Sequence, residues 1–204
     1  MAIKDVNIHL AAMDGDVVAI QSSRNHTPCA QRWLDEGLFV DKRDNFERTP
    51  LHQAAWSGRV EAMKLLLGAY AQIDARDRDQ CTPLHYAAST NQLAVAQELL
   101  RRKADANVKD IKHETPLFKA AMLGNADVVE HLLASGADVT IPDAHGHLPG
   151  GEFNTKVDGA ARERITAALT KEQEKRAAAR AKTKASELEE LQQRKKRRGC
   201  CAVM

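Results

Sequence analysis

Residues 81–110 read CTPLHYAASTNQLAVAQELLRRKADANVKD, and this stretch decides the fold. Its triplet Thr82-Pro83-Leu84 recurs as Thr49-Pro50-Leu51 and as Thr115-Pro116-Leu117, with 33 residues between successive copies. A fixed period of this length indicates one supersecondary unit copied along the chain. The sequence therefore predicts a solenoid, in which neighbouring copies stack and share one continuous core.

Within each copy, the residue types predict two short helices. Threonine is a good N-cap, and proline fits the first helical position that follows it. Small pairs such as Ala87-Ala88 let two helices approach closely, and pairs such as Leu99-Leu100 form the apolar stripe of the second helix. Gly58 and Gly124, with Asn91 in the middle copy, stand where a left-handed residue ends the first helix.

This pattern resembles the ankyrin repeat family, which combines a Thr-Pro-Leu-His opening, an antiparallel helix pair and a projecting finger. The resemblance implies an all-α ankyrin repeat solenoid of helix pairs with β-hairpin fingers, and the composition of the remaining residues predicts a long charged C-terminal helix after it. We expect the repeat domain to span residues 1–155. Its copies fall at about 5–43, 44–76, 77–109 and 110–142, with a degenerate copy at 143–155.

Some positions depart from the family pattern. The first copy, begun by Ile8-His9-Leu10-Ala11-Ala12, is longer than the others and contains an insertion around Ser22–Pro28. The finger tips usually carry glycine, as at Gly146, but they hold Glu47, Gln80 and His113 in the other copies. Lys103 likewise stands where we expect the glycines of the neighbouring copies, Gly68 and Gly136. A positive φ at such residues costs free energy.

The resemblance also implies a binding surface. Partners of this family usually contact the fingers and the end of each first helix, which line a concave face. By position, these places hold Phe46, Arg48, Trp56, Arg76, Arg78, Ile111, Met122 and Leu123. Aromatic and aliphatic anchors with an arginine rim are typical of interface hot spots. The alternative is that Trp56 and Met122 pack against the next repeat.

Nothing in the chain predicts catalysis, a cofactor or a metal. His52 and His85 belong to the Thr-Pro-Leu-His turn, where an imidazole is expected to bond loop backbone between repeats. His145 and His147 lack a third ligand nearby, and the four cysteines have neither disulfide nor zinc spacing. We find no phosphate-binding loop or nucleophile motif. The sequence therefore predicts a protein that is not an enzyme.

The charges divide the chain into two parts. Residues 156–199 contain 14 Lys/Arg and 7 Asp/Glu, whereas the preceding 155 residues contain 16 and 21. Residues 156–193 are rich in Ala, Glu, Lys and Arg, which predicts a charged helix or spacer. Its first turns, with Ala161, Ile165 and Leu169, are expected to complete the array. No heptad of apolar residues continues beyond them, which favours a single solvated helix over a coiled coil.

Residues 194–204, RKKRRGCCAVM, form a polybasic tail that resembles the C-terminal tails of Ras-type small GTPases. Cys201 followed by Ala, Val and Met matches the C-a-a-X signal for farnesylation, and Cys200 is a candidate for palmitoylation. The basic residues that would contact anionic lipid are Arg194, Lys195, Lys196, Arg197 and Arg198. A lipid plus a basic patch predicts stable anchoring.

Together these features predict a non-enzymatic, monomeric adaptor. It would bind a protein and no nucleic acid, and farnesylation would hold it at the cytoplasmic face of the plasma membrane or an endomembrane. The alternative is a soluble regulator or inhibitor of an enzyme, whose basic helix binds acidic protein or RNA. A third interpretation is a subunit that targets a phosphatase. Its docking motif needs a basic residue and then Val, with one further residue before Phe or Trp. Arg59-Val60 and Lys156-Val157 lack that aromatic residue.

Overall fold

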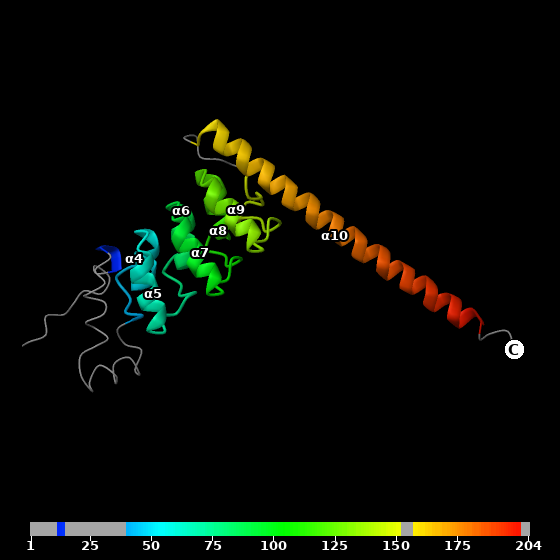
Figure 1. Cartoon of the computed structure of the whole chain (residues 1–204), viewed down its shortest axis with the longest axis horizontal. Helices are drawn as coiled ribbons and strands as arrows, with labels where there is room; N and C mark the ends of the chain where they lie inside the picture. The colour runs from blue at the N-terminus through cyan, green and yellow to red at the C-terminus, as the bar shows by residue number, and fades with distance from the viewer. Residues whose placement is uncertain (1–11, 15–39, 152–156, 201–204) are drawn as a thin grey trace, which may run out of the picture.

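The computed structural model describes residues 12–14, 40–151 and 157–200, except for the side chains of Leu188 and residues 191–200. Three helix pairs stand side by side in chain order, and a long helix crosses the end of the row (Figure 1). The pairs are α4 (Pro50–Trp56) with α5 (Val60–Gly68), α6 (Pro83–Ser89) with α7 (Leu93–Arg101), and α8 (Pro116–Leu123) with α9 (Ala126–Ala134). The long helix is α10 (Gly159–Cys200). The expected all-helical solenoid is confirmed.

The helices begin and end where the capping residues predict. Thr49, Thr82 and Thr115 have extended backbone and precede the proline that opens α4, α6 and α8. The turn after each first helix contains a residue of positive φ. It is Gly58 at 72°, Asn91 at 58° and Gly124 at 82°. The predicted left-handed positions are thus confirmed in all three pairs.

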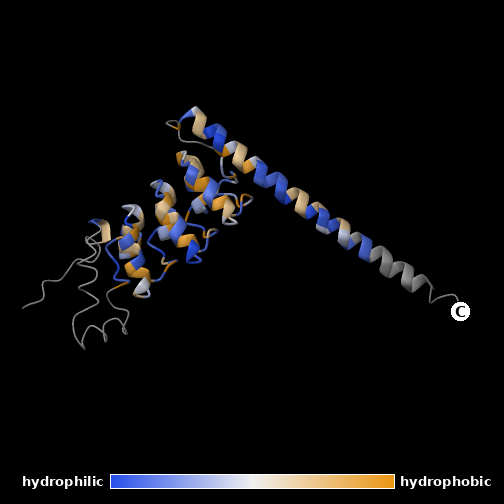
Figure 2. Ribbon diagram, viewed as in Figure 1, coloured by the Kyte–Doolittle hydropathy of each residue, from blue (hydrophilic) through white to orange (hydrophobic). Residues whose placement is uncertain are grey.

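The core runs without interruption through the row of repeats. The alanine pairs of α4, α6 and α8 have no exposed surface, and the leucine of each Thr-Pro-Leu triplet is at most 1% exposed. Leu66, Leu99 and Leu132 cover them from the second helices. Figure 2 shows apolar residues on the facing sides of the helix pairs and polar residues on the loops. Each repeat buries its neighbour's apolar face, as a solenoid requires.

The first turns of α10 close the end of this core. Ile165 is fully buried and Leu169 is 3% exposed, and both belong to the same apolar cluster as α9. Arg164 pairs with Asp127 at 3.0 Å and with Glu130 at 2.8 Å. Further along, Arg176 contacts the loop that follows α9. The predicted capping helix is confirmed.

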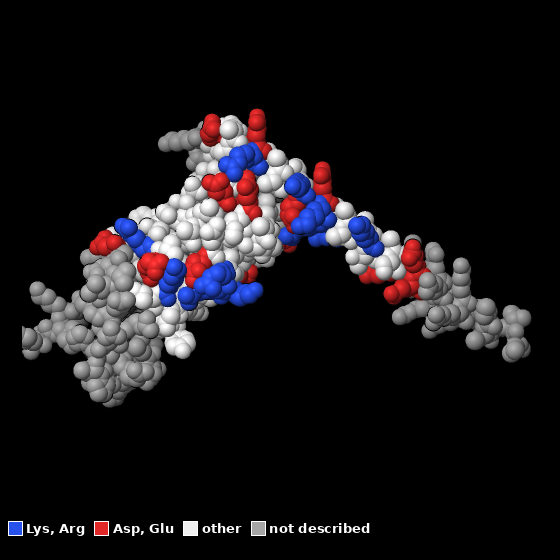
Figure 3. Space-filling model, in the orientation of Figure 1, with Lys and Arg blue, Asp and Glu red and all other residues white. Residues whose placement is uncertain are grey.

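Past Arg176, α10 leaves the array. Residues 177–187 are all exposed, and the helix continues to Cys200. At about 1.5 Å per residue, the part beyond Arg176 extends roughly 36 Å. Figure 3 shows side chains of both charge signs along this part of the helix. Within the described ranges, none of the helices has the length and hydropathy that a bilayer-spanning segment needs.

Two expectations need correction in detail. The fingers are turns, since no strand occurs in the described residues. The left-handed residue after α5 is Tyr70, with φ of 66°, and not Gly68, which is the last residue of the helix. Lys103 and Gly136 follow Tyr70 at the 33-residue period, with φ of 70° and 93°. Most of the first copy, including the predicted insertion at Ser22–Pro28, lies outside the described residues.

Candidate protein-binding surface

One aspartate builds each finger. In the finger of residues 74–81, Asp77 Oδ1 accepts backbone N–H bonds from Asp79 at 2.9 Å and from Cys81 at 2.8 Å. The same two bonds recur at the same length in the other three fingers, where the acceptors are Asp44, Asp110 and Asp143. An aspartate that accepts the N–H two residues on is a strong turn former. The 33-residue spacing of these aspartates is visible in the sequence, but their role in the fingers was not predicted from it.

In three of these aspartates, the second carboxylate oxygen is bound from the first helix of the same repeat. Gln53, Tyr86 and Lys119 occupy one position of the period and reach Asp44, Asp77 and Asp110 at 3.4, 2.7 and 2.7 Å respectively. Burial alone would raise the pKa of Asp110, but the hydrogen bond and charge of Lys119 outweigh it and lower that pKa. The first three fingers are therefore each fixed to their own helix, whereas Asp143 is bound by His147 of the same finger at 3.3 Å.

Neighbouring fingers are joined by backbone hydrogen bonds. Arg78 N–H donates to the carbonyl of Phe46 at 3.1 Å, and Ile111 N–H donates to that of Asp79 at 3.0 Å. A third bond, from Ala144 N–H to Lys112, continues the series at 2.9 Å. The row of fingers thus has a fixed register from one repeat to the next. A partner would meet a preformed surface, which lowers the entropy cost of binding.

His52 and His85 each connect one repeat to the next through a hydrogen bond to a backbone carbonyl. Thr82 N–H donates to His85 Nδ1 at 3.1 Å, so the other ring nitrogen carries the proton and donates to the carbonyl of Glu114 at 3.1 Å. His52 makes the equivalent bond to Cys81 at 3.0 Å. Burial lowers the pKa of His85 to about 4, which keeps the ring neutral. The structural role expected for these histidines is confirmed.

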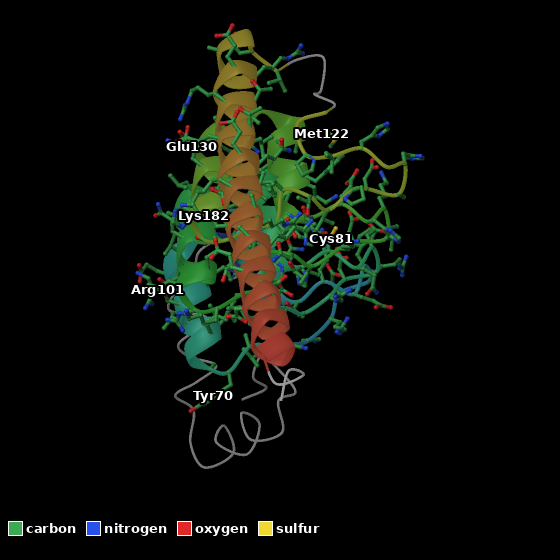
Figure 4. All side chains as sticks on the ribbon, turned by 90° about the vertical axis from the view of Figure 1, so that its right-hand side faces the viewer. Tyr70, Cys81, Arg101, Met122, Glu130 and Lys182 are labelled. Carbon is green, nitrogen blue, oxygen red and sulfur yellow. The ribbon has the colours of Figure 1, made fainter. Side chains whose placement is uncertain are left out.

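The predicted partner-binding residues lie on or beside the fingers. Phe46, Ile111 and Trp56 are 57%, 56% and 47% exposed, so Trp56 presents about half of its surface to solvent. Arg76 and Arg78 are exposed, whereas Arg48, Met122 and Leu123 are half-buried. Figure 4 shows Met122 and Cys81 on the side of the finger loops and Arg101 and Glu130 on the opposite side.

Two of the predicted arginines also hold local structure. Arg48 pairs with Asp44 at 2.8 Å and lies 4.7 Å from the ring centroid of Phe46, a cation–π contact that fixes this aromatic side chain in place. Arg78 donates to the carbonyl of Asn45 in the preceding finger at 2.8 Å. Arg48 thus contacts the exposed Phe46 ring, and Arg78 connects its own finger to the preceding one.

The described residues show little reactive chemistry. Burial raises the pKa of the Cys81 thiol to about 12, so the thiol stays protonated and unreactive at neutral pH. The rings of His145 and His147 lie 6.0 Å apart. Across residues 12–14, 40–151 and 157–190, no group of three or more His, Cys, Asp or Glu side chains is placed to hold a metal ion. The site can therefore bind by shape, charge and apolar contact.

The predicted lipidation and membrane-contacting residues lie beyond these contacts. Cys200 is the last residue of α10, and Cys201 is outside the described residues. The backbone of Arg194–Arg198 is helical, while their side chains are outside the description.

Comparison with known families agrees with this geometry. A family model described as ankyrin repeats (many copies) matches residues 8–67, and one described as ankyrin repeats (3 copies) matches residues 71–143. The chain carries ankyrin repeats. The match that starts at residue 8 extends the repeats into the first copy, most of which the structure does not describe. Among curated proteins, none matches the chain. Ankyrin repeats are protein-interaction modules, so the array has a protein-binding role.

Proposed function

We propose that this chain is a non-enzymatic adaptor that binds a protein through its fingers and is anchored to the cytoplasmic face of a membrane by a farnesyl group on Cys201. Its mechanism is recruitment, because a tethered binding module raises the local concentration of its partner at the membrane.

The course of α10 carries this proposal. The helix is fixed to the array through Ile165, Leu169 and Arg176, and it then extends away from the last repeat (Figure 1). A lipid placed after its end would lie tens of ångströms from the capped repeat, given the rise of about 1.5 Å per residue. The fingers would thus stay free to bind while the tail contacts lipid.

The tail has the residues that stable anchoring needs. One lipid chain alone binds membranes only reversibly, and a basic cluster or a second acyl chain makes the anchoring stable. The five basic residues 194–198 would contribute about 1 kcal/mol each beside anionic lipid. Cys200 offers a site for a palmitoyl group. Farnesylation requires Met204 to be the last residue of the protein.

Metabolic labelling with an isoprenoid analogue tests the anchor. We expect label and membrane association in the native chain, label without full membrane retention in Cys200→Ser, and neither in Cys201→Ser. Intact-mass measurement of the native protein shows in parallel whether its carboxyl end carries the lipid. An unmodified end, or unchanged membrane association of Cys201→Ser, contradicts the proposal.

A quantitative pull-down with the full chain tests the binding surface. The double substitution Phe46→Ala/Trp56→Ala should reduce partner capture at least tenfold, since hot-spot truncations often cost 2 kcal/mol or more. Its thermal midpoint should stay nearly unchanged, because both side chains are about half exposed. Tyr70→Ala is the matched control, since Tyr70 is an aromatic residue with 93% exposure, away from the fingers (Figure 4). Equal capture by all three proteins would refute the assigned surface.

A further inference from the structure

The repeat domain has a negative net charge, but the exposed charged side chains of its fingers are mostly basic. Residues 1–155 contain five more acidic than basic residues. Many of those carboxylates, however, are used inside the structure. Asp44, Asp77, Asp110 and Asp143 accept backbone N–H bonds within their own fingers, and Asp41 and Asp74 accept the N–H of Gln72 and Asp105 in the following repeat.

The charged groups left exposed on the fingers are mostly basic. In the fingers of residues 41–48, 74–81 and 107–114, the exposed basic side chains are Lys42, Arg43, Arg76, Arg78, Lys109 and Lys112. The exposed acidic ones are Glu47 and Asp79. Six of these exposed side chains are thus basic and two are acidic. The aspartates that accept N–H bonds keep their negative charge, but they are buried or half-buried. Arg43, Arg76 and Lys109 occupy one position of the 33-residue period, so they form a column across three repeats.

We propose that this finger surface binds an acidic, extended peptide segment of a partner protein, with carboxylates facing the Arg43–Arg76–Lys109 column. This inference rests on the proposed protein-binding role and specifies the partner's chemistry. Successive repeats lie roughly 10 Å apart, as packed helices do. A peptide in the polyproline II conformation rises about 3.1 Å per residue and turns once in three residues, so about every third residue of the partner should be Asp or Glu, on the side that faces the column.

The surface also offers apolar contacts that suit a peptide. Ile111 and Met122 are aliphatic and would accept apolar side chains between the carboxylates of the partner. The exposed Phe46 ring, held by Arg48, provides an apolar anchor at one end of the column.

Arg76, Lys109 and Lys112 are the residues to test. All three are exposed, whereas Arg43 and Arg78 also donate to the backbone of an adjacent finger. The triple substitution Arg76→Gln/Lys109→Gln/Lys112→Gln therefore removes charge from the surface without removing those contacts. The matched control is Lys171→Gln/Lys182→Gln/Lys184→Gln, which removes the same charge from exposed positions of α10.

Selection of a random dodecapeptide display library on the full chain provides the probe. We expect the selected peptides to be rich in Asp and Glu at intervals of about three residues, with apolar residues between them. The finger variant should bind the selected peptide about tenfold more weakly at moderate salt, as expected for three partly screened ion pairs. The α10 control should change the Kd less than about twofold, since those charges lie on α10 and not on the fingers. Thermal midpoints of both variants should match that of the native chain.

Several results would overturn the inference. One is the selection of neutral or basic peptides. A second is an unchanged Kd of the finger variant, or a larger loss of affinity in the α10 control than in the finger variant. A third is tighter binding of single-stranded uridine RNA, which would then displace the peptide. Comparison with the Phe46→Ala/Trp56→Ala variant separates the two proposals. If that variant loses its partner while the finger-charge variant keeps it, the acidic peptide is wrong and the adaptor function stands.

Discussion

The repeat array and the distal part of α10 use charged residues in opposite ways. In the array, the finger aspartates bind backbone N–H groups and side chains of the first helices, so their carboxylates determine local structure. From Ala177 to Glu187, by contrast, every side chain of α10 is exposed. Structure in the array therefore depends on contacts between segments tens of residues apart, whereas this part of α10 depends on local helix propensity alone.

This difference predicts how far the effect of a substitution spreads. A change in the array should be felt by the neighbouring repeats, because each copy is stabilised by the interfaces on both sides. A change in distal α10 should stay local.

Leu99→Ala should lower the free energy of unfolding of the whole array by about 2–5 kcal/mol. Leu99 is fully buried at the centre of the row, and truncation leaves a cavity that the rigid helix pairs cannot fill. Ala181→Gly, in the exposed part of α10, should cost no more than about 1 kcal/mol and only in that helix. Urea unfolding followed by tryptophan fluorescence measures the array. If Ala181→Gly shifts the urea midpoint of the array, the effect of a substitution in distal α10 does not stay local.

Ile165→Ala should release the docked end of α10 at a cost of about 2–3 kcal/mol, the low end for a buried isoleucine because only one repeat contacts it. Amide hydrogen exchange should then speed up in α9 and in the first turns of α10. Ile165→Val removes one methylene and should have a much smaller effect. If α9 amides exchange as slowly as in the native chain, the cap does not stabilise the array.

Acid should weaken the array through its buried histidines. Burial lowers the pKa of His85 to about 4, against about 6.5 in the unfolded chain. The neutral ring therefore contributes to the free energy of unfolding above pH 6.5, and this contribution is lost as the pH falls towards 4. Between pH 7 and pH 5 this loss is about 2 kcal/mol, and His52, whose pKa burial also lowers, adds to it.

The fourth repeat supplies the control for this pH dependence. Phe118 occupies the histidine position there, and its N–H donates to Thr115 Oγ1 at 3.2 Å. His85→Phe therefore places a residue that the fold already accepts at this position. Its unfolding free energy should be lower at pH 7, because the carbonyl of Glu114 loses its donor, but it should fall less between pH 7 and pH 5. An equal slope in both proteins would assign the acid sensitivity to other groups.

Most of the fold could be predicted from the sequence because it repeats. The Thr-Pro-Leu triplets indicate where helices begin, the alanine pairs indicate close helix packing, and the left-handed residues indicate where helices end. Because each feature recurs every 33 residues, the copies support one another. The capping role of Ile165 and Leu169 was also predictable, since the last repeat needs an apolar cover. The turn at the end of α5 was misplaced because Gly68 resembles a helix end, whereas the register puts Tyr70 there.

The details of the finger surface could not be predicted in the same way. Gln53, Tyr86 and Lys119 are chemically unlike, and only the geometry of the finger shows that each binds the aspartate of its own repeat. The same geometry turns the carboxylates inward. Net charge counted along the chain is acidic, while the exposed charge of the fingers is basic, and no composition argument separates the two.

The smallest effect concerns backbone strain at the ends of the second helices. Lys103 has φ of 70° and is exposed, while Gly136 holds the same position in the next repeat with φ of 93°. A left-handed residue with a side chain costs about 1–2 kcal/mol, and glycine loses about 0.5–1 kcal/mol of chain entropy on folding. Lys103→Gly should therefore stabilise the array by about 0.5 kcal/mol.

The opposite change completes this test. A Cβ atom at Gly136 would meet nothing within 4 Å, so Gly136→Ala changes only the same two backbone terms and should destabilise the array by about 0.5 kcal/mol. Lys103→Ala keeps the strain and should leave the urea midpoint nearly unchanged. Because these side chains contact little, any stabilisation seen in Lys103→Ala would show that the lysine side chain, and not its φ, limits the stability of this repeat.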